Sequence, residues 1–247
     1  MKDVLWGFHP VEEALLTGNR RLGILYLARK RDSARSRHLT QLARQRGARV
    51  KEVDVRTLDR LASGQAHQGV VATVEARPAR GLDDLLAELQ GRGSVILVVL
   101  DGVQDPHNLG AVVRNACLNG AAAVLLPRDR TAGVTPVVEK VAAGGLEHVD
   151  IVRVVNIAAA LRALKKEDFW IIGADPGGEE ELPGADLRGR VALVIGGEHQ
   201  GLRRLTKEHC DRLVRIPSTG RIESYNMGTA SALFLFSAFL QHRGGEP

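Results

Sequence analysis

Short apolar runs alternate with amphipathic segments along most of the chain, which has 247 residues. Runs rich in Val, Ile and Leu predict β-strands. They span residues 23–28, 69–74, 95–100, 122–126, 170–174, 191–195 and 213–216. Near-continuous apolar strands that alternate with helices are typical of a parallel sheet covered on both faces. We therefore predict an α/β fold.

Helix signals separate the first strands. Ser33 can cap the N-terminus of a helix, and Gly47 follows its C-terminal end. Pro10 suits the first turn of an earlier helix that ends near Gly18. These signals predict α/β structure in the N-terminal third as well.

An Arg-Pro-Ala-Arg-Gly segment at residues 77–81 interrupts the alternation of strands and helices. Proline and glycine in such a cluster favour a linker. We predict an N-terminal domain at residues 1–76, a linker and helix at 77–93, and a second domain at 94–247.

The last predicted helix, residues 226–242, is apolar on nearly every side. Such a helix must be buried all round, in the core of its own domain or against another subunit. Eight apolar residues fall within nine positions: Ala232, Leu233, Phe234, Leu235, Phe236, Ala238, Phe239 and Leu240.

The positive charge is concentrated near the N-terminus. Residues 1–75 carry fourteen Lys or Arg against eight Asp or Glu, whereas the remainder carries twenty against twenty-one. Between Arg20 and Lys51, eleven basic residues face one acid, Asp32. Such a strip either attracts a polyanion or is a solvated helix face. The candidate RNA-binding residues are Arg29, Arg35, Arg37 and Arg44.

Other classes of protein are disfavoured. The sequence has no signal-peptide pattern and no apolar run of the roughly 18 residues that cross a bilayer, so we expect a cytoplasmic protein without membrane partners. The two cysteines, Cys117 and Cys210, lack CxxC spacing, and neither a disulfide framework nor a metal site is expected.

Ligands of parallel sheets bind beyond the carboxyl ends of the strands, so the loops after the strands are of interest. The first such loop, residues 101–116, contains Asn108, which can cap the next helix, and Arg114, six residues later. An arginine in an otherwise apolar helix either faces an anion or a wet cleft, or forms a structural ion pair.

The second loop, residues 196–202, reads Gly-Gly-Glu-His-Gln-Gly-Leu. Its glycines permit close approach of a ligand to the backbone, and Glu198 places a carboxylate there. The loop matches neither a P-loop nor a dinucleotide-binding fingerprint.

The third loop and helix start, residues 216–230, contain Pro217, Gly220, Ser224 and Asn226. Ser224 could be a simple helix cap. No GxSxG elbow indicates a hydrolase.

Three patterns occur in order: Asn-Leu-Gly-Ala-x-x-Arg from residue 108, Gly-x-Glu-x-x-Gly-Leu from 196, and Ile-Pro-x-x-Gly-x-x-x-Ser-x-Asn from 216. Together they resemble the three motifs of the SpoU (TrmH/RlmB-like) family of knotted RNA ribose 2′-O-methyltransferases. The N-terminal Trp-Gly-Phe-His-Pro and the basic region after it are similar to the RNA-recognition domain of the RlmB subgroup.

The resemblance implies a SPOUT domain with a deep trefoil knot, although general chain rules favour an unknotted sheet. It also implies a small N-terminal α/β domain resembling a ribosomal protein, S-adenosylmethionine (AdoMet) as methyl donor, and a homodimer. The implied cofactor-binding residues are Gly196, Gly197, Ile216, Gly220 and Tyr225. The implied catalytic residues are Asn108, Arg114, Glu198, Ser224 and Asn226.

Two positions depart from the family pattern. Tyr225 stands where an aliphatic residue is usual, and His199-Gln200 replaces a small-basic pair. The family mechanism makes Arg114 the proton acceptor, although a guanidinium has a pKa above about 12. Alternatively, Arg114 holds the target phosphate and stabilises the alkoxide while water or Glu198 accepts the proton.

The resemblance implies a guanosine of 23S rRNA as the substrate. The alternatives are a tRNA ribose methyltransferase of the same family and a non-catalytic RNA-binding module. A dehydrogenase would need a dinucleotide fingerprint after its first strand, which this sequence lacks.

Overall fold

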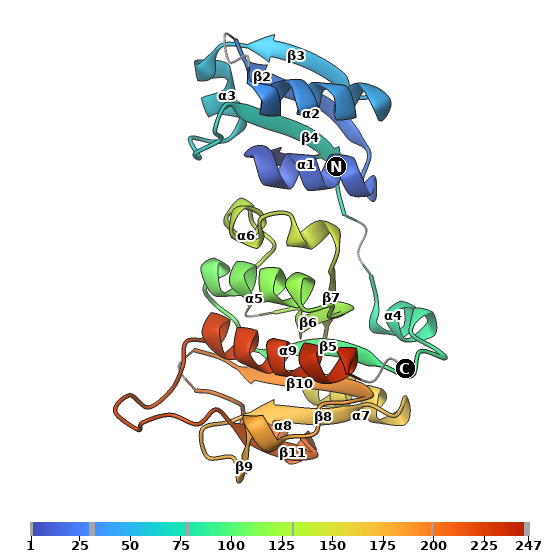
Figure 1. Cartoon of the computed structure of the whole chain (residues 1–247), viewed down its shortest axis with the longest axis vertical. Helices are drawn as coiled ribbons and strands as arrows, with labels where there is room; N and C mark the ends of the chain where they lie inside the picture. Colours follow the sequence, from blue (N-terminus) through green and yellow to red (C-terminus); the bar gives the residue numbers. More distant parts are fainter. Residues whose placement is uncertain (1, 30–32, 78–79, 130, 199, 245–247) are drawn as a thin grey trace. The chain divides into compact units, whose positions relative to one another are not determined.

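The computed structural model describes residues 2–29, 33–77, 80–129, 131–198 and 200–244 (Figure 1). The chain forms two compact units. The N-terminal unit comprises Met1–Pro78 and Val134–His148, and the C-terminal unit comprises Ala79–Gly133 and Val149–Pro247. The predicted division at 77–93 stays a prediction. The compact units differ from it in two respects, because the segment Val134–His148 packs with the N-terminal residues and most of the predicted linker and helix belongs to the C-terminal unit.

The N-terminal unit contains a four-stranded sheet in the order β1-β4-β2-β3. Its strands are β1 (Lys2–Trp6), β2 (Leu22–Ala28), β3 (Arg49–Val53) and β4 (Val70–Glu75). Its helices are α1 (Phe8–Thr17), α2 (Ala34–Gln45), α3 (Val55–Leu61) and α6 (Pro136–Ala142), followed by a 3₁₀ turn, η1 (Gly145–Glu147). Only β2 and β3 are parallel.

The predicted helix ends in this unit are confirmed. The Ser33 hydroxyl accepts a hydrogen bond from the backbone N–H of Ser36 over 3.1 Å and caps α2. Gly18 ends α1 with a φ of 68°, and Gly47 follows α2 with a φ of 70°. Glycine adopts this left-handed conformation without a steric penalty.

Arg20 is buried in the N-terminal unit, with 4% of its surface exposed. Its guanidinium forms a two-point ion pair with the buried carboxylate of Glu147 and lies 3.5 Å from Glu139. Burial raises the pKa of Glu139, and the positive charge of Arg20 opposes that shift. Arg20 therefore belongs to the interior of the unit and not to the basic surface strip in which the sequence placed it.

The C-terminal unit contains a seven-stranded sheet in the order β7-β6-β5-β10-β8-β11-β9. Its strands are β5 (Val95–Asp101), β6 (Ala123–Pro127), β7 (Asp150–Val154), β8 (Trp170–Ala174), β9 (Glu180–Glu181), β10 (Arg190–Gly196) and β11 (Arg212–Arg215). Every pairing is parallel. The predicted parallel sheet is confirmed, and all seven residues of the central β5 are buried.

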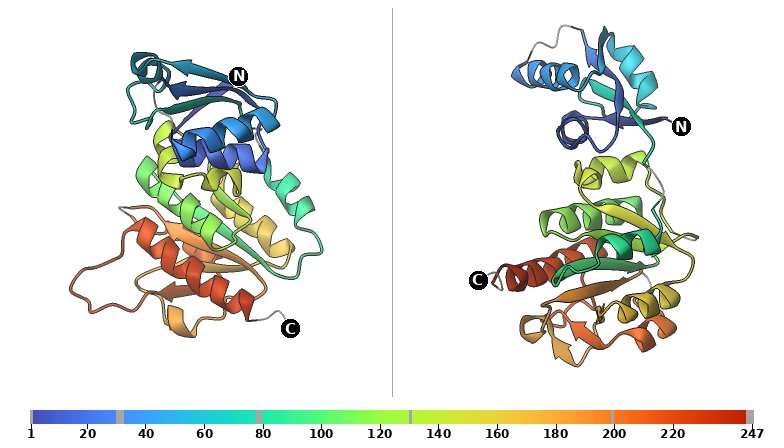
Figure 2. Two further views of the ribbon diagram at one scale, coloured as in Figure 1. Left: turned by 45° about the horizontal axis from the view of Figure 1, so that its top comes forward. Right: turned by 90° about the vertical axis from the view of Figure 1, so that its right-hand side faces the viewer.

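Helices cover both faces of this sheet, as Figure 2 shows. They are α4 (Leu82–Glu88), α5 (Pro106–Leu118), α7 (Ile157–Lys166), α8 (Arg204–His209) and α9 (Met227–Arg243), with a 3₁₀ turn, η2 (Leu182–Gly184). Helices α5 and α9 pack on each other, and α9 packs on β10. Helices α4 and α7 bury their leucines against Leu97 and Val99 of β5 on the opposite face.

Two helix caps differ from the sequence analysis. The cap of α5 is Asp105, whose carboxylate accepts a hydrogen bond from His107 N–H over 2.8 Å, so Asn108 lies inside the helix. The cap of α9 is Asn226, not Ser224. Both asparagine side chains are therefore placed by a helix N-terminus, at the edge of the sheet where ligands bind.

In the part of the chain that the structure describes, no helix combines the length and apolarity needed to cross a membrane. Within the described residues, neither Cys117 nor Cys210 takes part in a disulfide. Burial raises the pKa of the Cys210 thiol to about 12. This thiol is therefore protonated and unreactive near neutral pH.

Candidate active site

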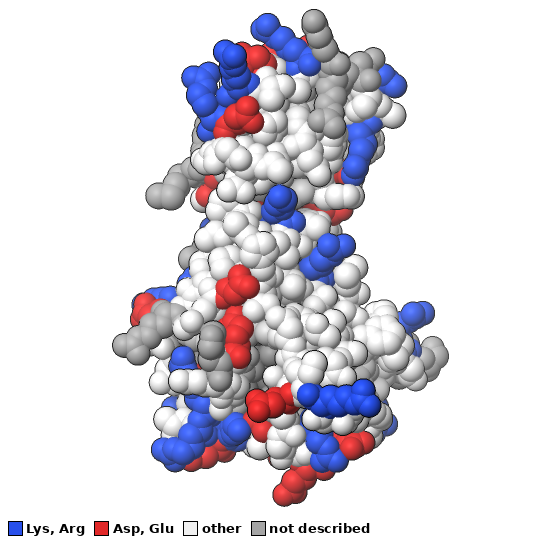
Figure 3. Space-filling view, turned by 90° about the vertical axis from the view of Figure 1, so that its left-hand side faces the viewer, with Lys and Arg blue, Asp and Glu red and all other residues white. Residues whose placement is uncertain are grey.

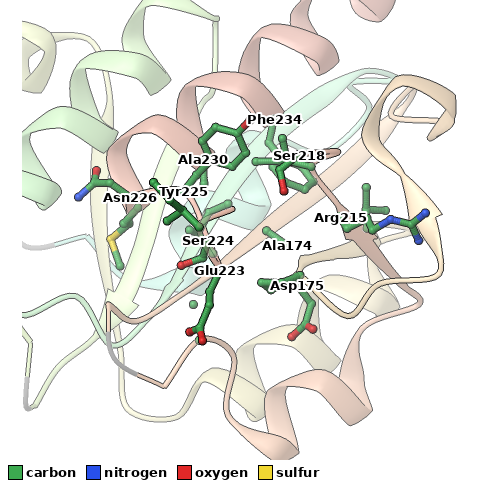
Figure 4. Close-up of a pocket in the computed structure, with 18 of the residues that line it drawn as sticks. Ala174, Asp175, Arg215, Ser218, Glu223, Ser224, Tyr225, Asn226, Ala230 and Phe234 are labelled. Carbon is green, nitrogen blue, oxygen red and sulfur yellow. The ribbon is translucent and has the colours of Figure 1, made fainter. Parts of the chain in front are cut away.

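A pocket opens at the carboxyl ends of strands β8, β10 and β11 (Figure 4). Its volume of about 1490 Å³ exceeds the roughly 300–1,000 Å³ of most small-molecule pockets. The pocket therefore has room for a cofactor and for part of a second substrate.

The pocket has apolar walls and a polar rim. The apolar side chains include Ile195, Val214, Ile216, Ile222, Tyr225, Met227 and Phe234. The charged side chains are Asp175, Glu181, Glu198, Lys207, Arg215, Arg221 and Glu223. Asp175 and Arg215 lie on one side of the pocket and Tyr225 and Asn226 on the other (Figure 4). Apolar walls suit a flat adenine base, and a polar rim suits the ribose and amino-acid ends of AdoMet.

Four of the five predicted cofactor-binding residues line the pocket. They are Gly196, Gly197, Ile216 and Tyr225. Gly220 is not among the lining residues, because it forms the exposed turn of the loop between β11 and α9 with a φ of +75°. Contact of these five residues with a cofactor stays a prediction.

The glycine loop between β10 and α8 folds back on itself. Gly197 and Gly201 exchange two backbone hydrogen bonds of 3.1 and 3.0 Å. A Cβ atom on Gly196 would lie 2.2 Å from the carbonyl carbon of Gly201, and one on Gly197 would lie 2.7 Å from the carbonyl oxygen of Gly102. Only glycine fits at positions 196 and 197, because neighbouring backbone packs directly against both residues.

A chain of hydrogen bonds joins the three predicted motifs. The side-chain amide nitrogen of Asn226 donates to the amide oxygen of Asn108 over 3.0 Å. The amide nitrogen of Asn108 donates to Glu198 Oε1 over 2.9 Å. Asn108 is buried, whereas Glu198 and Asn226 line the pocket. The structure therefore brings together three of the five predicted catalytic residues.

Glu198 also accepts hydrogen bonds from the backbone N–H groups of Gln104 and Asp105, over 3.4 and 3.3 Å. Partial burial alone would raise the pKa of Glu198, but the hydrogen bonds from Asn108 and the backbone outweigh burial and lower it. A carboxylate with a lowered pKa is a weaker proton acceptor. Its geometry favours a role in orienting Asn108 and the loop after β5.

Ser224 lies on the exposed loop before α9 and lines the pocket. Among the described residues, its hydroxyl forms no hydrogen bond and does not cap α9. The hydroxyl is thus free to contact a ligand, which keeps the predicted catalytic role open.

Arg114 is exposed on α5 and does not line the pocket. Within the described ranges it forms no hydrogen bond or ion pair, so the alternative of a structural ion pair within the chain finds no support there. The structure does not bring Arg114 together with Asn108, Glu198 and Asn226 in one chain.

The sequence analysis missed a charged pair at the rim. The ammonium group of Lys207 lies 2.5 Å from Asp175 Oδ2, and both residues line the pocket. Asp175 directly follows β8, so the rule that sites lie beyond strand ends could have identified it. Of the two departures from the family pattern, Tyr225 and Gln200 line the pocket, and His199 lies outside the described residues.

In the N-terminal unit, the four candidate RNA-binding arginines are all exposed. Arg35 stacks on the ring of Phe8, 4.9 Å from its centroid, and bonds to His9 over 3.2 Å. Figure 3 shows several Lys and Arg side chains at the end of this unit drawn at the top. Lys30 and Arg31 of the basic strip lie outside the described residues.

Two family models match the sequence. The model described as the SpoU rRNA Methylase family matches residues 95–236. The model described as RNA 2'-O ribose methyltransferase substrate binding matches residues 4–79.

Curated proteins match almost the whole chain. The chain is 41% identical over 243 residues to the 23S rRNA (guanosine-2'-O-)-methyltransferase RlmB of Bordetella pertussis, with 98% of each chain covered. It is 46% identical over 201 residues to the RlmB of Xylella fastidiosa, with 81% of this chain and 80% of that protein covered.

Solved structures share the fold. The SpoU methyltransferase AviRb of Streptomyces viridochromogenes, in complex with the cofactor AdoMet, is similar with a TM-score of 0.80 at 22% identity. The comparison covers 100% of this chain and 92% of AviRb. The A. aeolicus TrmH/SpoU tRNA modifying enzyme is similar with a TM-score of 0.57 at 26% identity, covering 66% of this chain and 83% of that one.

Proposed function

Because the chain belongs to the SpoU rRNA methylase family, we propose that it transfers a methyl group from AdoMet to the ribose 2′-hydroxyl of a guanosine in 23S rRNA. The observation that carries this proposal is the match to RlmB proteins over 98% of the chain. A cytoplasmic location follows from the same substrate.

The N-terminal unit favours ribosomal RNA over tRNA as the substrate. The match to RlmB of Bordetella pertussis includes this unit, whereas the tRNA modifying enzyme of A. aeolicus is similar over only 66% of this chain. The exposed arginines of this unit, among them Arg35 beside Phe8 and His9, would attract the phosphates of a large RNA.

The pocket fits AdoMet in shape and charge. The apolar walls suit the adenosine part, and the carboxylates at the rim favour a cationic sulfonium. When bound, AdoMet supplies the methyl group, held on a positively charged sulfur.

The residues of the chain would orient the acceptor. The hydrogen-bonded side chains of Asn226, Asn108 and Glu198 would position the acceptor ribose so that its 2′-oxygen points toward the methyl group. Correct alignment supplies much of the acceleration in such a transfer. The lowered pKa of Glu198 favours water as the proton acceptor.

We also propose that the chain works as a homodimer. Leu233, Phe236 and Leu240 form an apolar stripe on α9 and are 37%, 53% and 51% exposed. Leu118, at the end of the adjacent α5, is 69% exposed. An isologous contact through this surface would cover the stripe. Arg114, on the same helix as Leu118, would then serve the site of the partner, where its guanidinium could hold a phosphate.

Mapping of ribose methylation in 23S rRNA tests the function. RNA from a strain that lacks the gene should show one unmethylated guanosine ribose, and the purified protein with AdoMet should restore the methyl group. Unchanged 23S rRNA together with a lost methyl group in tRNA would support the tRNA alternative.

A further inference from the structure

Asp101 is a buried carboxylate directly behind the candidate cofactor pocket. It is the last residue of β5, its register partner on β10 is Gly196, and only 2% of its surface is exposed. It does not line the pocket. Burying a carboxylate is unfavourable unless hydrogen bonds and charges compensate, so its partners indicate its role.

One oxygen of Asp101 holds the far end of the glycine loop. Asp101 Oδ2 accepts a hydrogen bond from the backbone N–H of Arg203 over 2.8 Å. Arg203 is the cap residue of α8, and its own side chain makes no capping hydrogen bond. The other oxygen, Oδ1, is buried, forms no hydrogen bond within the described residues, and lies 3.7 Å from Arg203 Nε.

The glycine loop is thus fixed at both ends. Gly196 pairs with Asp101 in the sheet, and Arg203 is bonded to the side chain of the same residue. Between these ends, Gly197 and Gly201 are paired, and Leu202 is 3% exposed. Asp101 therefore meets both ends of the loop, through its backbone at the end of the strand and through its carboxylate at the start of the helix.

The two loops hold each other through a carboxylate from each. Glu198 of the glycine loop accepts from Gln104 and Asp105 in the loop after β5, and Asp101 at the start of that loop accepts from Arg203. Removing either carboxylate would leave the two loops joined by the other carboxylate alone.

We propose that Asp101 is a positioning residue that fixes the glycine loop in the shape that binds AdoMet, an inference that rests on the proposed function. It acts through the backbone of residues 196–203 and touches neither cofactor nor RNA. Its loss should therefore weaken AdoMet binding more than RNA binding.

The test compares Asp101→Ala with Asp101→Asn and with Asp186→Ala, which removes an exposed carboxylate elsewhere in the same unit. Calorimetry with AdoMet should give a Kd about tenfold or more higher for Asp101→Ala, as expected for loss of a hydrogen bond to a charged group. Asp101→Asn keeps an acceptor for Arg203 and should recover most of the affinity. The AdoMet affinity of Asp186→Ala should equal that of the wild type. The RNA affinity of every variant should also be unchanged.

Hydrogen exchange provides a readout that needs no cofactor. The amides of residues 200–203 should exchange faster in Asp101→Ala than in the wild type, while those of β5 and β10 stay protected. A wild type that binds no AdoMet would refute the proposed function, whereas the exchange result would still decide whether Asp101 holds the loop.

A second pair of variants covers the case in which Asp101→Ala fails to fold. Arg203 has a φ of −64°, which proline adopts without strain. Arg203→Pro removes the backbone donor and the side chain, whereas Arg203→Ala removes the side chain alone. We expect Arg203→Pro to bind AdoMet about tenfold more weakly than Arg203→Ala. Equal affinities in this pair, or a folded Asp101→Ala with wild-type affinity and exchange, would overturn the proposal.

Discussion

The side chain of Asn226, at one side of the pocket, donates a hydrogen bond to Asn108 over 3.0 Å. The oxygen of the same Asn226 amide accepts from Gly228 N–H over 2.8 Å and caps α9. One side chain therefore caps α9 and joins it to Asn108 in the first turn of α5.

These two roles can be separated by Asn226→Asp. Aspartate is an equally good helix cap, but it cannot donate to Asn108, so α9 should remain while the alignment of Asn108 is lost. We expect the melting temperature to change by only a few degrees and kcat/KM to fall about a hundredfold, because small misplacements at a reacting centre have effects of that size. Methyl transfer to 23S rRNA measures the rate.

Asn156→Asp is the matched control, since Asn156 caps α7 in the same manner through Ala159 N–H over 2.9 Å. It should leave activity unchanged. If the two variants lose activity equally, the link from Asn226 to Asn108 has no catalytic role.

The lowered pKa of Glu198 predicts a dependence of stability on pH. A carboxyl group whose pKa is lower in the folded state stabilises the fold above its unfolded pKa, and this contribution disappears as the pH falls through the folded pKa. The unfolding free energy of the wild type should exceed that of Glu198→Gln near neutral pH, and the difference should shrink below about pH 4.5. Urea unfolding at several pH values measures it.

The same variant tests whether Glu198 is the proton acceptor. We expect Glu198→Gln to lower the rate without changing the shape of the pH profile between about pH 6 and 9, because Glu198 is already ionised there. An acidic limb that is present in the wild type and absent from Glu198→Gln would instead identify Glu198 as the base.

Mixing two inactive variants tests whether Arg114 acts in the site of a partner subunit. If it does, a heterodimer of Arg114→Ala and Asn226→Ala has one intact composite site. A fully exchanged equal mixture should then recover about a quarter of the wild-type activity, since half of the dimers are mixed and each has one working site. If activity does not recover after proven subunit exchange, Arg114 does not act in the site of the partner subunit.

A charged residue introduced into the apolar stripe of α9 should dissociate the dimer. Phe236→Asp places a carboxylate in the proposed interface, and sedimentation should show a monomer with little activity. Val155→Asp is the control, because Val155 is also apolar and 73% exposed but lies in the turn after β7. A wild type that sediments as an active monomer would exclude the dimer.

Reversing the charges of Arg35, Arg37 and Arg44 to glutamate should weaken RNA binding and leave AdoMet affinity unchanged. The slope of log K against log salt should decrease by up to about 0.7–0.9 for each lost phosphate contact. Reversal of three exposed arginines of the C-terminal unit, Arg92, Arg162 and Arg204, matches the change in net charge. If both triple variants weaken RNA binding equally, the basic strip contributes to binding only through net charge.

The strands that could be predicted from the sequence are those with buried surroundings. All seven apolar runs are strands, because a central strand needs apolar residues on both faces. Strands β1, β3, β7 and β9 were not predicted, because they form the edges of the two sheets and contain charged residues, as in Arg-Val-Lys-Glu-Val of β3. Edge strands carry charge without being disrupted by it.

The candidate site was predictable in its loops but not in its contacts. The positions after strands identified Asn108, Glu198 and Asn226 as neighbours, because parallel strands end at one edge of the sheet. No local pattern specified that the three side chains form one hydrogen-bonded chain, or that Gly220 does not line the pocket. The knotted path stays a prediction drawn from the family resemblance.

The ion pair of Arg20 with Glu147 spans 127 positions of the sequence. During synthesis from the N-terminus, Arg20 emerges long before its partner, and the N-terminal unit cannot be complete until residue 148 has left the ribosome. A fragment that ends at residue 78 would leave the guanidinium of Arg20 without Glu139 and Glu147. The N-terminal unit can therefore be completed only after β5 and β6, the first two strands of the seven-stranded sheet, have been synthesised.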